Sequence, residues 1–77
     1  MMLTQNSQCA KILARLRQRK PGFVLMPTLA RISGSYNVHS RIDELRKRHG
    51  HDIENRTDVS VRPHISKYRL VKLNEQN

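Results

Sequence analysis

The N-terminal part of the chain opens with apolar residues at helical spacing. The first stripe has i, i+3, i+4 and i+7 spacing and consists of Cys9, Ile12, Leu13 and Leu16. This spacing predicts an amphipathic helix over residues about 5–18, because it places the four side chains on one face. Thr4 or Asn6 would cap its start by accepting a hydrogen bond from a backbone N–H group. Pro21-Gly22 would end it.

Two shorter elements and a turn are expected next. Residues 23–25 are a brief apolar run, which predicts a short strand or an extended connector. Pro27 suits a first helical turn and Thr28 offers capping chemistry, so the helix predicted over about 28–33 has two alternative starts. Gly34 would permit the tight turn that follows.

A third helix is expected over about 37–49, ended by Gly50. Its core-facing positions, at i, i+4, i+7 and i+11, are Val38, Ile42, Leu45 and His49. At 100° per residue, the opposite face carries Tyr36, Ser40, Asp43 and Lys47. We expect Asp43 to pair with Lys47, one turn further along the helix. The polar face would then hold hydrogen-bonding side chains at its start and cations at its end.

After Gly50 the apolar period changes from that of a helix to that of a strand. Alternation around Ile53 predicts a strand over about 51–56, and alternation around Tyr68 and Leu70 predicts a second over about 65–73. Pro63 favours a loop between them. An isolated hairpin is marginal in water, so it should pack on the helices through these three side chains. Residues 23–25 could add a third strand.

The charge of the chain indicates what kind of partner it binds. The 77 residues, expected to form one domain, contain 15 Lys and Arg against 6 Asp and Glu, for a net charge of +9. Asp43 is the first acidic residue. Such an excess favours polyanionic partners. A chain this short has little room for a deep catalytic cavity, so we expect no enzyme.

The order of elements resembles that of the small winged helix-turn-helix proteins of phages and prophages. The resemblance is carried by Ile12, Leu13, Leu16 and Gly34, by Arg41, Ile42, Glu44, Leu45, Arg46, Gly50 and Ile53, and by Tyr68-Arg69-Leu70. It implies a mainly α fold with a small β-sheet, in which three helices precede a C-terminal β-hairpin wing. It also implies sequence-specific binding to double-stranded DNA, in transcriptional regulation or in phage recombination and excision.

In helix-turn-helix domains the start of the second helix of the motif meets the bases. The base-contact candidates are therefore Tyr36, Asn37, Ser40 and Arg41. The candidates for phosphate contact, along the third helix and the wing, are Arg46, Lys47, Arg48, Arg56, Arg62, His64 and Lys67. Two structural alternatives stay open: Asn37 would only cap the helix, and Arg41 would pair with Glu44 or with another helix.

Other classes of function are weaker. Cys9, His49, His51 and His64 lack the spacing of zinc ligands, so we expect no metal, cofactor or small-molecule ligand. The alternative to DNA is a protein-interaction module that docks an acidic partner. Double-stranded RNA also stays open, whereas few aromatic residues argue against single strands. No apolar run suits a membrane span and no secretory signal is visible, so we expect a cytoplasmic protein, nucleoid-associated or in a phage-infected bacterial cell. A domain of 77 residues contacts few base pairs, so it could bind DNA as a homodimer or in tandem.

Overall fold

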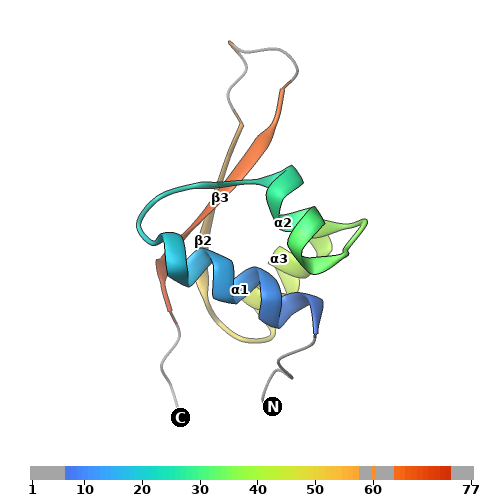
Figure 1. Cartoon of the computed structure of the whole chain (residues 1–77). Helices are drawn as coiled ribbons and strands as arrows, with labels where there is room; N and C mark the ends of the chain where they lie inside the picture. The colour runs from blue at the N-terminus through green and yellow to red at the C-terminus, as the bar shows by residue number, and fades with distance from the viewer. Residues whose placement is uncertain (1–6, 58–59, 61–63, 74–77) are drawn as a thin grey trace.

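In the part of the chain that the structure describes, three helices pack with a three-stranded antiparallel sheet (Figure 1). The structure is a computed structural model that describes residues 7–57, 60 and 64–73. In chain order the elements are α1 (Gln8–Arg19), β1 (Val24–Leu25), α2 (Met26–Ser33), α3 (Val38–Lys47), β2 (Asp52–Thr57) and β3 (Ser66–Lys72). The expected order of helices and strands is therefore confirmed, with different bounds.

The helices begin at positions that the apolar pattern did not define. Ser7 caps α1, because its Oγ accepts a hydrogen bond from the Ala10 N–H at 3.0 Å. The expectation of a cap at Thr4 or Asn6 is wrong, and both residues lie outside the described part. Helix α2 begins earlier than predicted, with Leu25 as an N-cap that makes no side-chain cap hydrogen bond. Pro27 falls in its first turn, where a missing N–H costs little.

Strand β3 lies in the centre of the sheet, between β1 and β2. Val24 pairs with Tyr68 on one side, and Ile53 pairs with Leu70 on the other. The register shifts between Asp52 and Ile53, as in a β-bulge. The short run at 23–25 thus supplies a third strand, over Val24–Leu25.

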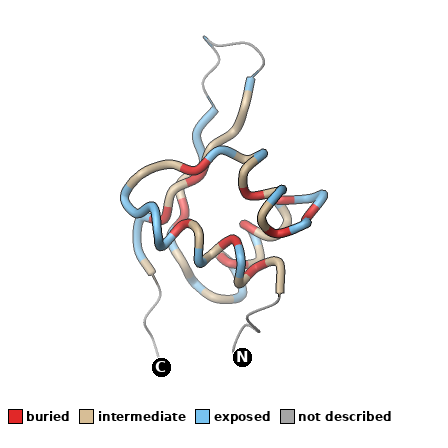
Figure 2. The backbone as a smooth tube through the Cα atoms, in the orientation of Figure 1, coloured by how far each residue is buried: buried red, intermediate tan, exposed pale blue. Residues whose placement is uncertain are grey.

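One face of the sheet packs on the helices and closes the core. Side chains of all three helices and of the strands form one buried apolar cluster. Figure 2 marks the buried positions along the backbone of these helices and strands. The buried apolar residues are Cys9, Ile12, Leu16, Val24, Leu29, Val38, Ile42, Leu45, Ile53, Tyr68 and Leu70. The inward positions expected in the first helix, the third helix and the hairpin are confirmed, with Leu13 and His49 only partly buried.

The turn between α2 and α3 is held by a short series of hydrogen bonds. Gly34 has a φ of 73°, a left-handed conformation that favours glycine. The Ser35 N–H donates to Ser33 Oγ at 3.2 Å, and the Asn37 N–H donates to Ser35 Oγ at 3.1 Å. Both serines are buried. The direction in which α3 leaves the turn is therefore set by residues of the turn itself.

Beyond the helices, β2 and β3 continue as a hairpin that projects from the body (Figure 1). Residues 58–59 and 61–63 of the connecting loop lie outside the described part. A helix-turn-helix followed by a β-hairpin wing is thus the layout of the molecule, and the expected fold class is confirmed.

Candidate nucleic-acid interface

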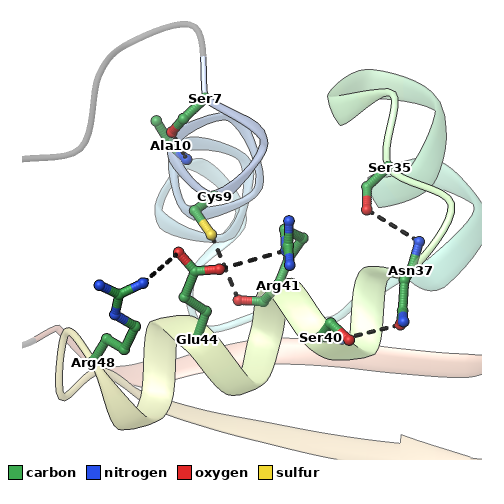
Figure 3. A network of polar contacts seen from close by, with 9 residues as sticks. All are labelled: Ser7, Cys9, Ala10, Ser35, Asn37, Ser40, Arg41, Glu44 and Arg48. Atoms are coloured by element: carbon green, nitrogen blue, oxygen red, sulfur yellow. Dashed lines mark hydrogen bonds and ion pairs between the residues drawn. The ribbon is translucent and has the colours of Figure 1, made fainter.

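One flank of α3 faces α1 and is held there by a polar network (Figure 3). Glu44 Oε1 lies 3.6 Å from Arg41 Nε, and Glu44 Oε2 lies 3.9 Å from Arg48 Nη1. The Cys9 thiol donates to the Arg41 carbonyl oxygen at 3.8 Å. Arg41 Nε is buried and has no hydrogen-bond partner among the described residues. Two predicted DNA contacts, Arg41 and Arg48, thus lie against Glu44.

The buried thiol of Cys9 belongs to this packing. Burial raises the pKa of Cys9, and the neighbouring carboxylate of Glu44 raises that pKa further. A thiol with a raised pKa stays protonated at neutral pH and is a poor nucleophile. Its position therefore supports contact between α1 and α3 rather than chemistry at sulfur.

The other flank of α3 faces the sheet. The Arg46 guanidinium donates to the Ile53 carbonyl oxygen from Nε at 3.0 Å and from Nη2 at 2.7 Å. Its Nη1 lies 3.5 Å from Asp43 Oδ1. The expected pair of Asp43 with Lys47 is therefore wrong, since Arg46 is the partner one residue nearer along the chain. Arg46, predicted to contact phosphate, joins α3 to β2.

His39 lies on the same flank and contacts the buried Tyr68. The Tyr68 hydroxyl is within hydrogen-bond distance of His39 Nδ1 and lies 3.2 Å from Nε2. The two rings meet edge to face, with centroids 5.5 Å apart. Burial raises the pKa of Tyr68, so its hydroxyl stays protonated. This contact ties α3 to the central strand near the start of the helix.

Between the two flanks, α3 and the turn before it present an outward stripe, which we define as Tyr36 in the turn and Ser40, Asp43 and Lys47 in α3. Tyr36, Asp43 and Lys47 are exposed, and Ser40 is half-buried. Tyr36 is completely exposed, at 107% of its reference area. The predicted base-contact residues Tyr36 and Ser40 and the predicted phosphate contact Lys47 lie on this stripe.

Asn37 stands at the start of the stripe as the N-cap of α3. Its Oδ1 accepts a hydrogen bond from the Ser40 N–H at 3.2 Å (Figure 3). Bidentate contact with adenine uses the amide oxygen as well as the amide nitrogen of asparagine. Asn37 thus caps α3, and any contact with a base shares an oxygen with the cap.

The cations of the wing gather on the sheet face turned away from the helices. Arg56, Lys67 and Arg69 lie over the Phe23 ring, with charged groups 5.6, 4.8 and 5.4 Å from its centroid. Glu54 accepts from Arg56 at 2.9 Å and from Arg69. The hydrogen bond from Arg69, reinforced by Arg56, lowers the pKa of Glu54.

The sequence pattern did not identify Arg69 and Phe23 as members of a charged site. Alternation along β3 places Arg69 opposite Tyr68 and Leu70, but the position of Phe23 depends on the pairing of β1 with β3. The structure therefore separates the predicted phosphate contacts into two groups. Lys47 lies on the outward stripe, whereas Arg56 and Lys67 lie around Phe23. His64 is exposed, and Arg62 lies outside the described part.

Comparison with protein-family models, with curated proteins and with solved structures gives no match for the chain.

Within residues 7–57, 60 and 64–73, no helix is long and apolar enough to cross a membrane. The same residues contain no group of three or more His, Cys, Asp or Glu side chains that could hold a metal ion.

Proposed function

We propose that the protein binds double-stranded DNA sequence-specifically, with α3 in the major groove. The observation that carries the proposal is which sides of α3 contact the rest of the protein. One flank is tied to α1 through the Cys9 thiol and the Arg41 carbonyl oxygen, and the other is tied to the sheet through Arg46 and His39. The stripe between them holds polar and aromatic side chains that the fold itself does not bury.

The residues of the stripe have the chemistry of groove contact. Tyr36 and Ser40, near the N-terminal end of α3, would meet base edges, where helix-turn-helix proteins read sequence. Lys47, at the opposite end, would hold a phosphate. Asp43 is exposed, but its charge is partly compensated by Arg46. Asn37 would position the helix and contribute its amide nitrogen to recognition.

The net charge of +9 supports a polyanionic partner for such a stripe. We place the protein in the cytoplasm with bacterial or phage DNA, as a transcriptional regulator or a recombination factor. A stripe of this length covers few base pairs, so two copies would bind as a homodimer or in tandem. Selection of bound duplexes from a random pool tests this, because a palindromic consensus indicates a dimer.

The salt dependence of affinity provides the main test. With about four to six phosphates contacted, log K should fall with log salt with a slope of about −4 to −5. Ser40→Ala should lower discrimination between selected and random duplexes, whereas Lys47→Ala should weaken both alike and reduce the slope by about one. Fluorescence anisotropy with the two duplexes measures both effects.

Two outcomes would contradict the proposal. Affinity for duplex DNA that does not change with salt would exclude phosphate contact as its source. Identical effects of Ser40→Ala and Lys47→Ala on selected and random duplexes would mean that α3 does not read bases. Glu54→Gln, on the far side of the sheet, is the matched control and should leave discrimination unchanged.

A further inference from the structure

The sheet face turned away from the helices is a second charged surface, distinct from the outward stripe of α3. Directly paired residues of antiparallel strands point to the same face. Lys67 is paired with Leu25 on one side and with Arg56 on the other, while Arg69 is paired with Glu54. Alternation along β3 adds Val71 to this face. We call these residues, together with Phe23, the outer sheet face.

The outer sheet face has an excess of positive charge concentrated over an aromatic ring. Three cations, Arg56, Lys67 and Arg69, lie over Phe23 and are opposed within the cluster by the single carboxylate of Glu54. The ring and the pairing with Glu54 hold these long side chains in place before any partner arrives. Preorganised cations lose less conformational entropy on binding an anion.

Exposed apolar side chains border this cluster. Leu25 is 49% exposed and Val71 is 40% exposed, and they are two of the three large hydrophobic residues exposed within the described part of the chain. A hollow of about 320 Å³ runs beside β1 and is lined by Arg15, Arg19, Phe23, Val24, Leu25 and Thr28. It adds two further cations and an apolar wall at the edge of the sheet.

We propose that the outer sheet face binds an acidic segment of a partner protein, one that alternates carboxylates with apolar side chains. Its carboxylates would pair with the guanidinium groups of Arg56 and Arg69, which match carboxylates in geometry, and with the ammonium group of Lys67. Its apolar side chains would cover Leu25 and Val71 and enter the hollow. Complementary charge selects the partner, and the apolar contacts add affinity.

Two observations favour a protein segment over a second stretch of DNA. The outer sheet face is turned away from the helix-packed core and belongs to β1, β2 and β3, whereas the outward stripe belongs to α3 and the turn before it, so the two surfaces are formed by different elements. Phosphates also gain nothing from the exposed Leu25 and Val71, whereas apolar side chains of a peptide do. The proposal therefore stands independently of DNA binding by α3.

Selection from a random dodecapeptide display library, with the full chain as bait, tests the proposal. Enriched peptides should combine Asp or Glu with Leu, Ile or Phe, and synthetic copies should bind in fluorescence anisotropy. Leu25→Asp should weaken that binding by about tenfold or more, because it removes an apolar contact and adds a repelling charge. Aspartate suits the N-cap position of α2 that Leu25 occupies, so this variant should fold.

A matched control distinguishes the two surfaces. Lys47→Glu, on the outward stripe, should keep peptide affinity within about twofold and lose duplex binding. Val71→Glu should repeat the loss caused by Leu25→Asp. The proposal is overturned if the enriched peptides lack acidic residues, if none binds better than its scrambled copy, or if Lys47→Glu rather than Leu25→Asp abolishes peptide binding. A loss of duplex affinity in Leu25→Asp equal to that in Lys47→Glu would make this face a DNA surface instead and overturn the proposal.

Discussion

At the scale of single residues, the cations of α3 divide by what they contact. Arg46 donates twice to the Ile53 carbonyl oxygen, whereas Lys47, the next residue, is exposed on the outward stripe. Sequence patterns treat both as basic residues near the end of a helix, where either would complement the helix dipole. Their neighbours in space make the first a structural link and leave the second for a partner.

Replacing Arg46 should therefore change stability more than DNA recognition. Arg46→Ala removes two charged hydrogen bonds and should lower the free energy of unfolding by about 1–2 kcal/mol, a value reduced by the partial exposure of the guanidinium. Urea unfolding followed by circular dichroism measures the change. The salt slope of DNA binding should stay the same.

Lys47→Ala is the matched control and should show the reverse: unchanged unfolding and a salt slope smaller by about one. If Arg46→Ala instead left unfolding unchanged and reduced the slope, Arg46 would be a phosphate contact and the assignment of a structural link would be wrong.

At the scale of elements, the start of α3 depends on the cap at Asn37. The Asn37 Oδ1 accepts from the Ser40 N–H, and aspartate offers an equivalent oxygen. Asn37→Ala should lower the free energy of unfolding by about 1 kcal/mol, while Asn37→Asp should leave it within about 0.5 kcal/mol of the native value.

The same pair of variants tests recognition separately from folding. Asn37→Asp removes the amide donor and places a carboxylate at the groove end of α3, so it should weaken duplex binding by about tenfold while the fold is kept. Equal destabilisation by Asp and Ala in thermal unfolding would show that the Asn37 oxygen does not cap the helix.

The elements themselves were largely predictable from the sequence, because apolar spacing reports which face is buried. Val38, Ile42 and Leu45 in α3, and Tyr68 and Leu70 in β3, lie in the core as their periods predicted. Helix starts were less predictable, because capping is local chemistry with several alternatives, and Ser7 caps α1 in place of the residues expected.

The candidate site was predictable only in part. The outward positions of Ser40 and Lys47 in α3 follow from helical geometry alone. The contacts of Arg46 and Phe23 do not follow from the sequence, since they depend on how α3 meets β2 and how β1 pairs with β3. Contacts between elements distant in the chain leave no trace in the local pattern of hydrophobic and polar residues.

At the scale of the whole molecule, the outward stripe and the outer sheet face are supported by one small core. The helices and the inner sheet face bury a single cluster of apolar side chains, and the outward stripe and the outer sheet face belong to elements that both pack on this cluster. A domain of this size has a stability of roughly 4–12 kcal/mol, at about 0.05–0.15 kcal/mol per residue. Small changes in ionisation therefore affect the whole molecule.

Acidification should destabilise the fold in two steps, the first due to protonation of His51 and the second due to protonation of Glu54. Burial, with His49 and Arg17 adding repulsion, lowers the pKa of His51 from its ordinary value of 6.5, so the unfolded chain takes up this proton first. Stability due to His51 is present above about pH 6.5 and is lost as the pH falls below it. The lowered pKa of Glu54, ordinarily 4.5, acts in the same direction at lower pH.

Urea unfolding at a series of pH values between about 7.5 and 3.5 should show both losses. His51→Gln should flatten the upper step and leave the lower one, because glutamine keeps a polar side chain without titrating. Glu54→Gln should flatten the lower step alone, since its partners Arg69 and Arg56 then face an uncharged amide at every pH. An upper step that persists unchanged in His51→Gln would show that another group causes it. The positive charge of the native protein increases as its carboxylates are protonated, so self-repulsion adds to the loss at low pH and should be reduced by salt.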